Sequence, residues 1–272
     1  MIGLELSILH STSGRPYSPD PSNGDIQMTM ISVRDLDSAV RVLTLDRANK
    51  RNAFNREIVD ELRQALLDFQ ASAQRVLVLR ADGDHFCAGA DLADPPLDFA
   101  KCLPGMGVHV TKPIISATQG WTIGLGFTLT MLTDMVIAAD DTRFSFPEAR
   151  VGVFGGVGAA LAGRIPQKVA IEFLMLGEPM HARRAYEVGM VNRVVPRTEL
   201  DATALEIATA LSGMAPKVLA AIKRWTAQVT PKAPAEVFAV EAGLVAEMAA
   251  SDDFREGMAS FREKRAPRFT GR

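Results

Sequence analysis

One carboxylate of the sequence is placed where it could move protons. Glu148 follows an aromatic-rich, strand-like run, RFSF, and precedes a glycine-rich loop. Few residues near it in sequence could pair with its charge except Arg143 and Arg150. A carboxylate in an apolar pocket has a raised pKa and can take a proton from one carbon and return it to another. An ordinary surface glutamate is the alternative, and the residue type alone does not separate the two.

Two glycine-rich turns could supply the other half of such chemistry. The segment DHFCAGADL (84–92) follows an expected strand over 75–81, and GWTIGLGFTL (120–129) follows a similar run and leads into a helix. Backbone N–H groups at such turns and at a helix N-terminus lack acceptors of their own. Two of them at neighbouring strand ends could converge on one oxygen, as in an oxyanion hole. Ordinary strand-to-helix turns remain the competing interpretation.

Several other kinds of site are disfavoured. GLGFTL has Leu129 where a dinucleotide fingerprint needs its third glycine, and no GxSxG hydrolase motif is present. We interpret His85 and His181 as polar loop or helix residues, and Cys87 as a small packed thiol. The four histidines are scattered and no CxxC occurs. We therefore expect no metal.

The composition predicts a globular protein. The 272 residues are 47% hydrophobic and carry a formal net charge of −2, which suffices for a large core and gives no nucleic-acid surface. A small basic patch could still hold a phosphorylated ligand. Two cysteines indicate a reducing, cytoplasmic location. No apolar run predicts a membrane span, and the N-terminus does not resemble a signal peptide.

Hydrophobic patterns predict an α/β core followed by helices. We expect a helix over 56–73, capped by Asn55. Strands are expected over 28–34, 39–45, 75–81, 112–120 and 134–140. Their alternation with helices favours a parallel sheet. After about residue 165, helices are expected over 167–177, 181–188, 199–213, 216–229, 234–249 and 252–264. The predicted organisation is a disordered tail (1–25), a core (26–200) and a helical C-terminal region (201–272).

Five segments together resemble the crotonase family, the enoyl-CoA hydratase/isomerase proteins, over about residues 28–269. In order they are LDRANKRNAFN, LRADGDHFCAGADL, KPIISATQGWTIGLGFTLTMLTDMVIAADDTRFSFPEARVGV, GMVNRVVP and DDFREGMASFREKRAPRF. The resemblance implies a superhelical core of stacked ββα turns, with C-terminal helices that pack against neighbouring subunits in homotrimers or hexamers. It implies an acyl-CoA substrate. Coenzyme A is then part of the substrate and no separate cofactor is expected.

The resemblance also implies roles for individual residues. The N–H groups of Ala90 and Leu125 would hold the thioester oxygen, Glu148 would be a catalytic carboxylate, and Gly156 would lie near the reacting carbons. The implied substrate and CoA contacts are Lys50, Arg51, Ala88, Asp91, Leu92 and Lys264.

The departures from the family pattern bear on the reaction. Hydratases of this family use two glutamates, and the position of the first is Thr128 here. A loop proline is replaced by Gly155, and the chain is shorter between Asp91 and Lys112, a region that shapes the acyl pocket. One remaining glutamate best matches double-bond isomerisation of an enoyl-CoA. The alternatives are hydration or dehydration of a specialised enoyl-CoA, a catalytically silent acyl-CoA-binding protein, and a subunit that serves oligomer assembly.

An apolar wall would prepare Glu148 for proton return by raising its pKa. The aromatic residues near it in sequence are the candidates for this wall: Phe144, Phe146 and Phe154.

Overall fold

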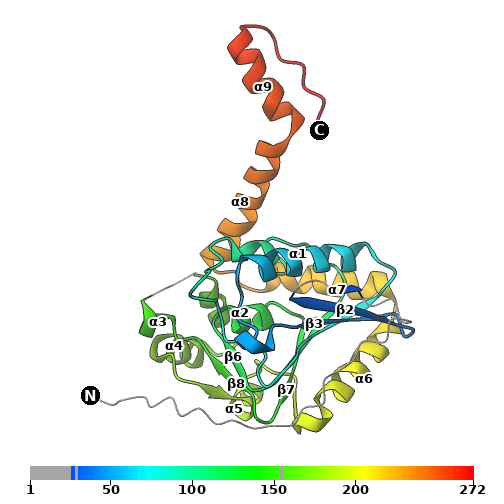
Figure 1. Ribbon diagram of the computed structural model, residues 1–272, viewed down its shortest axis with the longest axis vertical. Helices are drawn as coiled ribbons and strands as arrows, with labels where there is room; N and C mark the ends of the chain where they lie inside the picture. Colours follow the sequence, from blue (N-terminus) through cyan, green and yellow to red (C-terminus); the bar gives the residue numbers. More distant parts are fainter. Residues whose placement is uncertain (1–25, 28–29, 153–155) are drawn as a thin grey trace.

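The strands form two sheets (Figure 1). The structure, a computed structural model, describes residues 26–27, 30–152 and 156–272. Among these residues the larger sheet has the order β1-β2-β3-β4-β5-β7-β10 and the smaller one β6-β8-β9. The larger sheet contains β1 (Ile26–Gln27), β2 (Ile31–Leu36), β3 (Val40–Leu45), β4 (Val76–Ala81), β5 (Ile114–Thr118), β7 (Met135–Ala139) and β10 (Arg193–Val195). The smaller sheet contains β6 (Trp121–Ile123), β8 (Arg143–Ser145) and β9 (Met180–His181).

Parallel pairing brings three strand ends to one edge of the larger sheet. β3 pairs with β4, β4 with β5 and β5 with β7, all in parallel. The segments that follow β3, β4 and β5 therefore begin at the same edge. These are the basic loop after Leu45 and the two glycine turns after Ala81 and Thr118. β4 is buried almost along its whole length, as expected for a strand covered on both faces.

Helices cover both faces of this sheet. The α-helices are α1 (Arg56–Ala71), α2 (Leu125–Met131), α3 (Glu148–Val151), α4 (Gln167–Leu176), α5 (Ala182–Glu187), α6 (Leu200–Ser212), α7 (Pro216–Val229), α8 (Pro234–Ala250) and α9 (Asp252–Glu263). The 3-10 turns are η2 (Ala48–Lys50), η3 (Phe99–Cys102), η4 (Val157–Gly163) and η5 (Arg197–Glu199). α1 packs in the core on one face, and α6 buries Leu200, Ala204 and Ala208 on the other.

The start of α1 follows directly from its sequence. The Asn55 side chain accepts a hydrogen bond from the N–H of Ile58 at 3.1 Å, which satisfies one of the free donors at the helix N-terminus. Apolar residues at helical spacing then face the core. They are Ile58, Val59, Leu62, Ala65, Leu66 and Phe69.

An aromatic cluster joins the second sheet to α2. Phe127 of α2 packs edge-on against Phe144 and Phe146, with ring centroids 6.4 and 5.9 Å apart. Phe173 of α4 lies 5.2 Å from the same ring. Aromatic pairs in such tilted arrangements add stability beyond the apolar area that they bury. The cluster fixes α2 relative to β8, the strand that leads to Glu148.

The last two helices form an arm that projects from the body (Figure 1). The C-terminal segment runs back along α9, where the Asp252 N–H donates to the Arg272 carbonyl oxygen at 2.8 Å. Large apolar side chains on the arm are exposed, including Phe238 at 74% and Phe261 at 82%. The arm therefore presents apolar surface that the described residues do not cover.

The predicted elements are confirmed with small shifts at their ends. The strand expected over 75–81 is β4, and the helix expected over 216–229 is α7 with the same bounds. β2 continues to Leu36, into the DLDS segment predicted as a turn. β6 and β9 had no predicted counterpart, because strands of three and two residues are too short to show a period. The tail over 1–25 lies outside the described residues.

No single helix within the described ranges is long and apolar enough to cross a membrane. The helical segments Arg197–Ser212 and Pro216–Val229 reach that length and composition only as a pair bent by 108°.

Candidate active site

The loop after β3 lies along the first glycine turn. The Phe54 N–H donates to the Gly89 carbonyl at 2.8 Å, and the Asp91 N–H donates to the Phe54 carbonyl at 2.7 Å. The Ala88 N–H donates to the Arg51 carbonyl at 2.9 Å. These bonds hold the backbone of 88–91 against the basic loop in the manner of a short strand pair.

The two glycine turns are also bonded to each other. The Cys87 N–H donates to the Trp121 carbonyl at 3.1 Å, and the Ile123 N–H donates to the Cys87 carbonyl at 2.9 Å. A Cβ atom on Gly126 would lie 2.5 Å from that of Cys87, so only glycine allows this approach. The segments expected to converge from neighbouring strand ends are therefore in direct contact.

Two backbone N–H groups of these turns are free to bind a ligand oxygen. Ala90 is paired with Phe54 in a short parallel bridge. Both hydrogen bonds of this bridge join Phe54 to the residues on either side of Ala90, Gly89 and Asp91. The N–H of Ala90 itself therefore points away from Phe54. Leu125 is the first residue of α2, where an N–H has no acceptor within the helix. Among the turn, loop and cap hydrogen bonds of the described residues, none is donated by the N–H of Ala90 or of Leu125.

Glu148 and both turns meet at Gly124. A Cβ atom built on Gly124 would lie 3.1 Å from Oε1 of Glu148 and 3.9 Å from the Cα of Gly89. Gly124 has φ of 52° and ψ of −110°, a conformation that L-residues avoid. The missing side chain thus leaves the carboxylate beside the backbone that carries Ala90 and Leu125.

Glu148 has the environment of a proton carrier. Its Oε2 atom is buried and has no hydrogen-bond partner among the described residues. Burial raises the pKa of Glu148 to about 7, because removal from water disfavours the charged form. The neighbouring arginines are engaged elsewhere: Arg150 donates to the Leu176 carbonyl at 2.7 Å, and the guanidinium of Arg143 lies over the Trp121 ring. This geometry disfavours a solvated surface charge.

Thr128 does not supply a second catalytic group. It is buried, and its hydroxyl donates to the Gly124 carbonyl at 3.0 Å. A threonine hydroxyl is not a base at neutral pH, and here its proton is already bound to the backbone. Among the described residues near Gly124, the acid–base group is therefore Glu148, whose Oε1 atom lies 3.1 Å from a Cβ built on Gly124.

The residues expected around Glu148 are distributed as follows. Phe144 and Phe146 are buried in the aromatic cluster, where they anchor the segment that ends at Glu148. Phe154 and Gly155 lie outside the described residues. Gly156 has φ of 78°, and a Cβ atom there would lie 2.8 Å from that of Ala235 on α8. Its predicted place near the reacting carbons stays a prediction.

The predicted CoA contacts fall into two groups. Lys50, Arg51 and Leu92 are exposed on the loops beside the site, where a large ligand can reach them. Lys264 is the residue after α9, the last helix of the arm that projects from the body (Figure 1), so it belongs to a different part of the fold from the others. Asp91 forms an ion pair with Arg47 at 2.8 Å. The hydrogen bond from the Ala93 N–H and, after it, the contact with Arg47 lower the pKa of Asp91.

His85 and Cys87 take part in holding the turns. Nδ1 of His85 accepts a hydrogen bond from the Trp121 N–H at 3.3 Å. Sγ of Cys87 accepts one from the Gly89 N–H at 3.3 Å, and burial raises the pKa of this thiol to about 12. A thiol with this pKa stays protonated at neutral pH, so it is a poor nucleophile.

Asn52 is the positioning residue that the sequence interpretation missed. It is fully buried with φ of 54°. Its side-chain nitrogen donates to the carbonyls of Asp82 and His85, each at 2.9 Å, and its oxygen accepts from the Arg47 N–H at 2.9 Å. One side chain thus ties the loop after β3 to the turn after β4. The available signal was an asparagine in a tight loop, since asparagine tolerates left-handed backbone.

No group of three or more His, Cys, Asp or Glu side chains in the described ranges could hold a metal ion.

Comparison with known proteins identifies the family. The family model described as enoyl-CoA hydratase/isomerase matches residues 35–97 and 106–272. The chain belongs to the enoyl-CoA hydratase/isomerase family. It is 32% identical over 247 residues to a probable enoyl-CoA hydratase, echA8, of Mycobacterium bovis, which covers 87% of this chain and 96% of that protein. It is also 32% identical to the 2,3-dehydroadipyl-CoA hydratase of Escherichia coli, over 86% of this chain and 96% of that protein.

A solved structure of the same family confirms the crotonase-like fold. The enoyl-CoA hydratase/isomerase from Pseudoalteromonas atlantica superposes with a TM-score of 0.69 at 31% identity. The match covers 89% of this chain and all of that chain, 100%. The expected α/β core followed by C-terminal helices is therefore correct for this family member.

The Asn52 contacts predict a stability change. In Asn52→Ala, the Arg47 N–H and two carbonyls lose their partner. A fully buried polar group left unpaired costs about 1–3 kcal/mol, and these three part-buried groups cost less each because water can reach them. We expect the free energy of unfolding to fall by about 2–5 kcal/mol in urea titrations. Arg51→Ala is the matched control, since Arg51 also has left-handed backbone, with φ of 52°, but is exposed. Equal losses in the two variants would show that backbone strain, and not the buried network, sets the effect.

Proposed function

We propose that this protein moves the double bond of an enoyl-CoA, through an enolate stabilised by two backbone N–H groups and with Glu148 as the single proton carrier. The observation that carries the proposal is the position of Glu148. It lies beside Gly124 with one carboxylate oxygen buried and unpartnered among the described residues. Thr128 stands where the resemblance places the first of the two hydratase glutamates, and its hydroxyl is bonded to the Gly124 carbonyl.

The reaction needs an oxygen site and one base. The thioester carbonyl oxygen would accept hydrogen bonds from the N–H groups of Ala90 and Leu125. Glu148 would remove a proton from the carbon next to the carbonyl, and the electrons would pass into the carbonyl to form a conjugated enolate. The protonated Glu148 would then return the proton to the far carbon of the conjugated system. The double bond moves and no atom is gained or lost.

Two general effects supply the rate. Each well-placed N–H donor to the enolate oxygen is worth on the order of 10²–10³ in rate. A positioned base is worth about 10²–10⁴. A pKa of about 7 suits both halves of the proton transfer, because near neutral pH neither the carboxylate nor the acid form of Glu148 dominates.

Hydration or dehydration of an enoyl-CoA is the second candidate. The names of related proteins, such as 2,3-dehydroadipyl-CoA hydratase, favour it. Hydration requires activation of a water and delivery of a proton to the α-carbon. Without a carboxylate at position 128, Glu148 would have to do both in one concerted step. The hydroxyl of Thr128 is bonded to Gly124 and supports a positioning role at most.

An acyl-CoA-binding protein without activity and a subunit for oligomer assembly are rival proposals. Both predict that substrate carbons exchange no protons in the active site. The buried, unpartnered Oε2 of Glu148 and the close approach at Gly124 would have no use in either role.

We also propose that the protein assembles as a homotrimer or hexamer in the cytoplasm. α7 buries none of its residues and exposes Ile222 and Trp225, and the arm exposes Phe238 and Phe261. Apolar surface of this extent supports contact with further copies of the chain. In such an assembly, Lys264 would reach a CoA phosphate at the site of a neighbouring subunit.

Substitution of Glu148 tests the proposed reaction. Glu148→Gln keeps the size of the side chain but cannot accept a proton. We expect kcat to fall by about 10²–10⁴, with the affinity for a non-reacting acyl-CoA changed by less than about threefold. Product formation from 2-enoyl, 3-enoyl and 3-hydroxyacyl-CoA thioesters, followed by mass spectrometry, distinguishes isomerase from hydratase. Glu178→Gln is the control, because Glu178 is an exposed glutamate that pairs with Arg150.

Exchange of the α-proton in deuterium oxide separates the rival roles. The parent should exchange this proton and Glu148→Gln should not. Tight binding without exchange in the parent favours the silent binder. Equal exchange in parent and variant places the catalytic base elsewhere.

The assembly proposal predicts sedimentation behaviour. At micromolar concentration we expect a species of three or six chains. Trp225→Glu should shift the distribution toward smaller species, because it places a charge on the exposed apolar face of α7. A stable monomer of the parent protein at this concentration is incompatible with the proposal.

A further inference from the structure

A buried ion pair outside the candidate active site joins the base of the arm to the body of the protein. Nη2 of Arg164, the residue that follows η4, donates to Oε1 of Glu236 in the first turn of α8 at 2.8 Å. Only 6% of the Glu236 side chain and 21% of the Arg164 side chain are exposed. The proposed mechanism at Glu148 uses neither residue.

Each partner also binds a backbone group of its own segment. Oε2 of Glu236 accepts a hydrogen bond from the Ala233 N–H at 2.8 Å, and Nη1 of Arg164 donates to the Ala160 carbonyl at 2.8 Å. A buried ion pair adds little stability over apolar packing, because the loss of hydration offsets the attraction between the charges. Separation of the two segments, however, would leave each charge in a buried place without its partner, which is costly. The pair therefore selects one arrangement of α8 on η4.

The segment that enters α8 packs closely against η4. A Cβ atom built on Gly163 would lie 3.0 Å from both the Cβ and the carbonyl oxygen of Pro231. A Cβ atom built on Gly156 would lie 2.8 Å from that of Ala235. Gly156 and Gly163 are at the two ends of η4, so both ends touch this segment.

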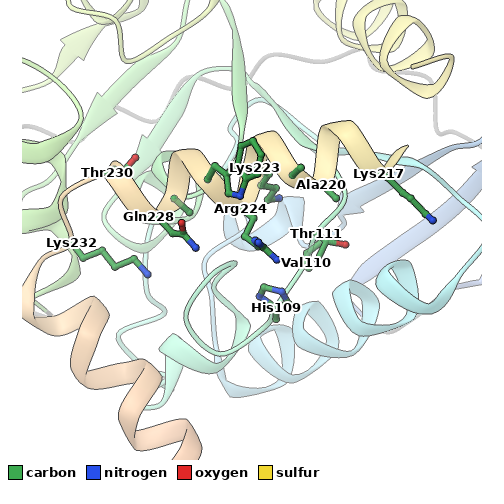
Figure 2. A pocket seen from close by; sticks show the side chains of 13 residues that line it. His109, Val110, Thr111, Lys217, Ala220, Lys223, Arg224, Gln228, Thr230 and Lys232 are labelled. Atoms are coloured by element: carbon green, nitrogen blue, oxygen red, sulfur yellow. The ribbon is translucent and has the colours of Figure 1, made fainter. Parts of the chain in front are cut away.

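The base of the arm is also fixed through α7. Figure 2 views the hollow beside α7, with Thr230 at the end of this helix and Lys232 on the short link into α8. Within α7, the ammonium group of Lys223 donates to the Asp134 carboxylate at 2.7 Å and to the Lys112 carbonyl at 2.9 Å. These contacts hold α7 on the larger sheet, so α8 begins at a place that the sheet sets.

η4 also rests on the segment that carries Glu148. A Cβ atom built on Gly158 would lie 2.2 Å from Cζ of Phe146, so the backbone of η4 touches this ring directly. Leu161 of η4 belongs to the same buried cluster as Phe146. Phe146 is two residues before Glu148 in the sequence. η4 therefore contacts both the start of α8 and the aromatic residue that anchors the carboxylate.

We propose that Arg164 and Glu236 are positioning residues for Glu148. Their ion pair holds η4 against the ring of Phe146, and this contact keeps the carboxylate in its buried place beside Gly124. Because Glu236 lies on α8, the same pair connects the arm to the candidate active site. The inference rests on the proposed role of Glu148 as the proton carrier, but the burial of Glu148 can be measured without turnover.

Glu236→Gln tests the pair with a small change. The amide can keep the bond from the Ala233 N–H but lacks the charge that pairs with Arg164. We expect kcat to fall by roughly 10–10²-fold, since a small displacement caused by a distant substitution can have this effect. The affinity for a non-reacting acyl-CoA should stay close to that of the parent. This result separates a displaced proton carrier from a damaged binding site.

The carbonyl stretch of protonated Glu148 reports its surroundings directly. Infrared difference spectra between Glu236→Gln and the same variant with Glu148→Gln isolate this band as pH is varied. In the parent we expect a midpoint of about 7. In Glu236→Gln the midpoint should move toward 4.5, the ordinary value for glutamate, because a loosened segment admits water to the carboxylate. A loss of stability alone would lower the melting temperature and leave the midpoint unchanged.

Further variants control for charge and for the helix. Arg164→Lys keeps the positive charge, so it should retain more activity than Arg164→Gln. Glu241→Gln makes the same change as Glu236→Gln at an exposed residue of α8 and should match the parent in kcat and midpoint. Sedimentation shows whether each variant assembles as the parent does. Should Glu236→Gln fail to fold, Arg164→Lys carries the same two measurements.

Three results would overturn the inference. One is a midpoint for Glu236→Gln equal to that of the parent, whatever its kcat. Another is a changed midpoint that appears only together with changed sedimentation, which assigns the pair to assembly. The third is a parent midpoint near 4.5, which leaves no buried carboxylate to position. A parent that shows the midpoint of about 7 and its shift in Glu236→Gln, but exchanges no α-proton, contradicts the proposed function alone and supports the positioning pair.

Discussion

The site depends on one buried carboxylate oxygen, Oε2 of Glu148, which has no hydrogen-bond partner among the described residues. An unpaired polar group out of water costs free energy, so Oε2 of Glu148 lowers the stability of the fold unless a substrate or proton occupies it. The protein holds it there because Gly124 has no side chain and the aromatic cluster fixes the segment before Glu148. Burial raises the pKa of Glu148 to about 7, whereas a glutamate in water has a value of 4.5.

The rest of the site is a set of backbone contacts that place two N–H groups opposite this carboxylate. The parallel sheet brings three loops to one edge. The Asn52 side chain joins the first loop to the second, and backbone bonds of Cys87 join the second to the third. None of these contacts performs chemistry. They set where the two N–H donors and the carboxylate lie relative to one another, and oxyanion stabilisation of the proposed kind depends on how donors are placed. Thr128 lies within this scaffold with its hydroxyl bonded to the Gly124 carbonyl, so its contacts leave the arrangement of the turns intact.

Much of this could be predicted from the sequence, and the reasons are local. The apolar runs of β4 and β5 predict buried parallel strands, and Asn55 predicts the start of α1. Both predictions depend only on side chains that are close together in sequence. The convergence of the two glycine turns could be predicted because each turn follows a strand, and neighbouring parallel strands end at the same edge of a sheet. Asn52 could not be assigned, because its three bonds join residues up to 33 positions apart.

The position of the arm could also not be predicted from sequence patterns. α9 was predicted as a helix, but its apolar side does not show whether it packs on its own core or away from it.

The protonation of Glu148 is the most direct test of this account. Infrared difference spectra between the parent and Glu148→Gln isolate the carbonyl stretch of a protonated carboxyl group as pH is varied. The account predicts that this band titrates with a midpoint of about 7. A midpoint near 4.5, the ordinary value for a glutamate in water, would show a solvated carboxylate and contradict the proton carrier at the centre of the proposed mechanism.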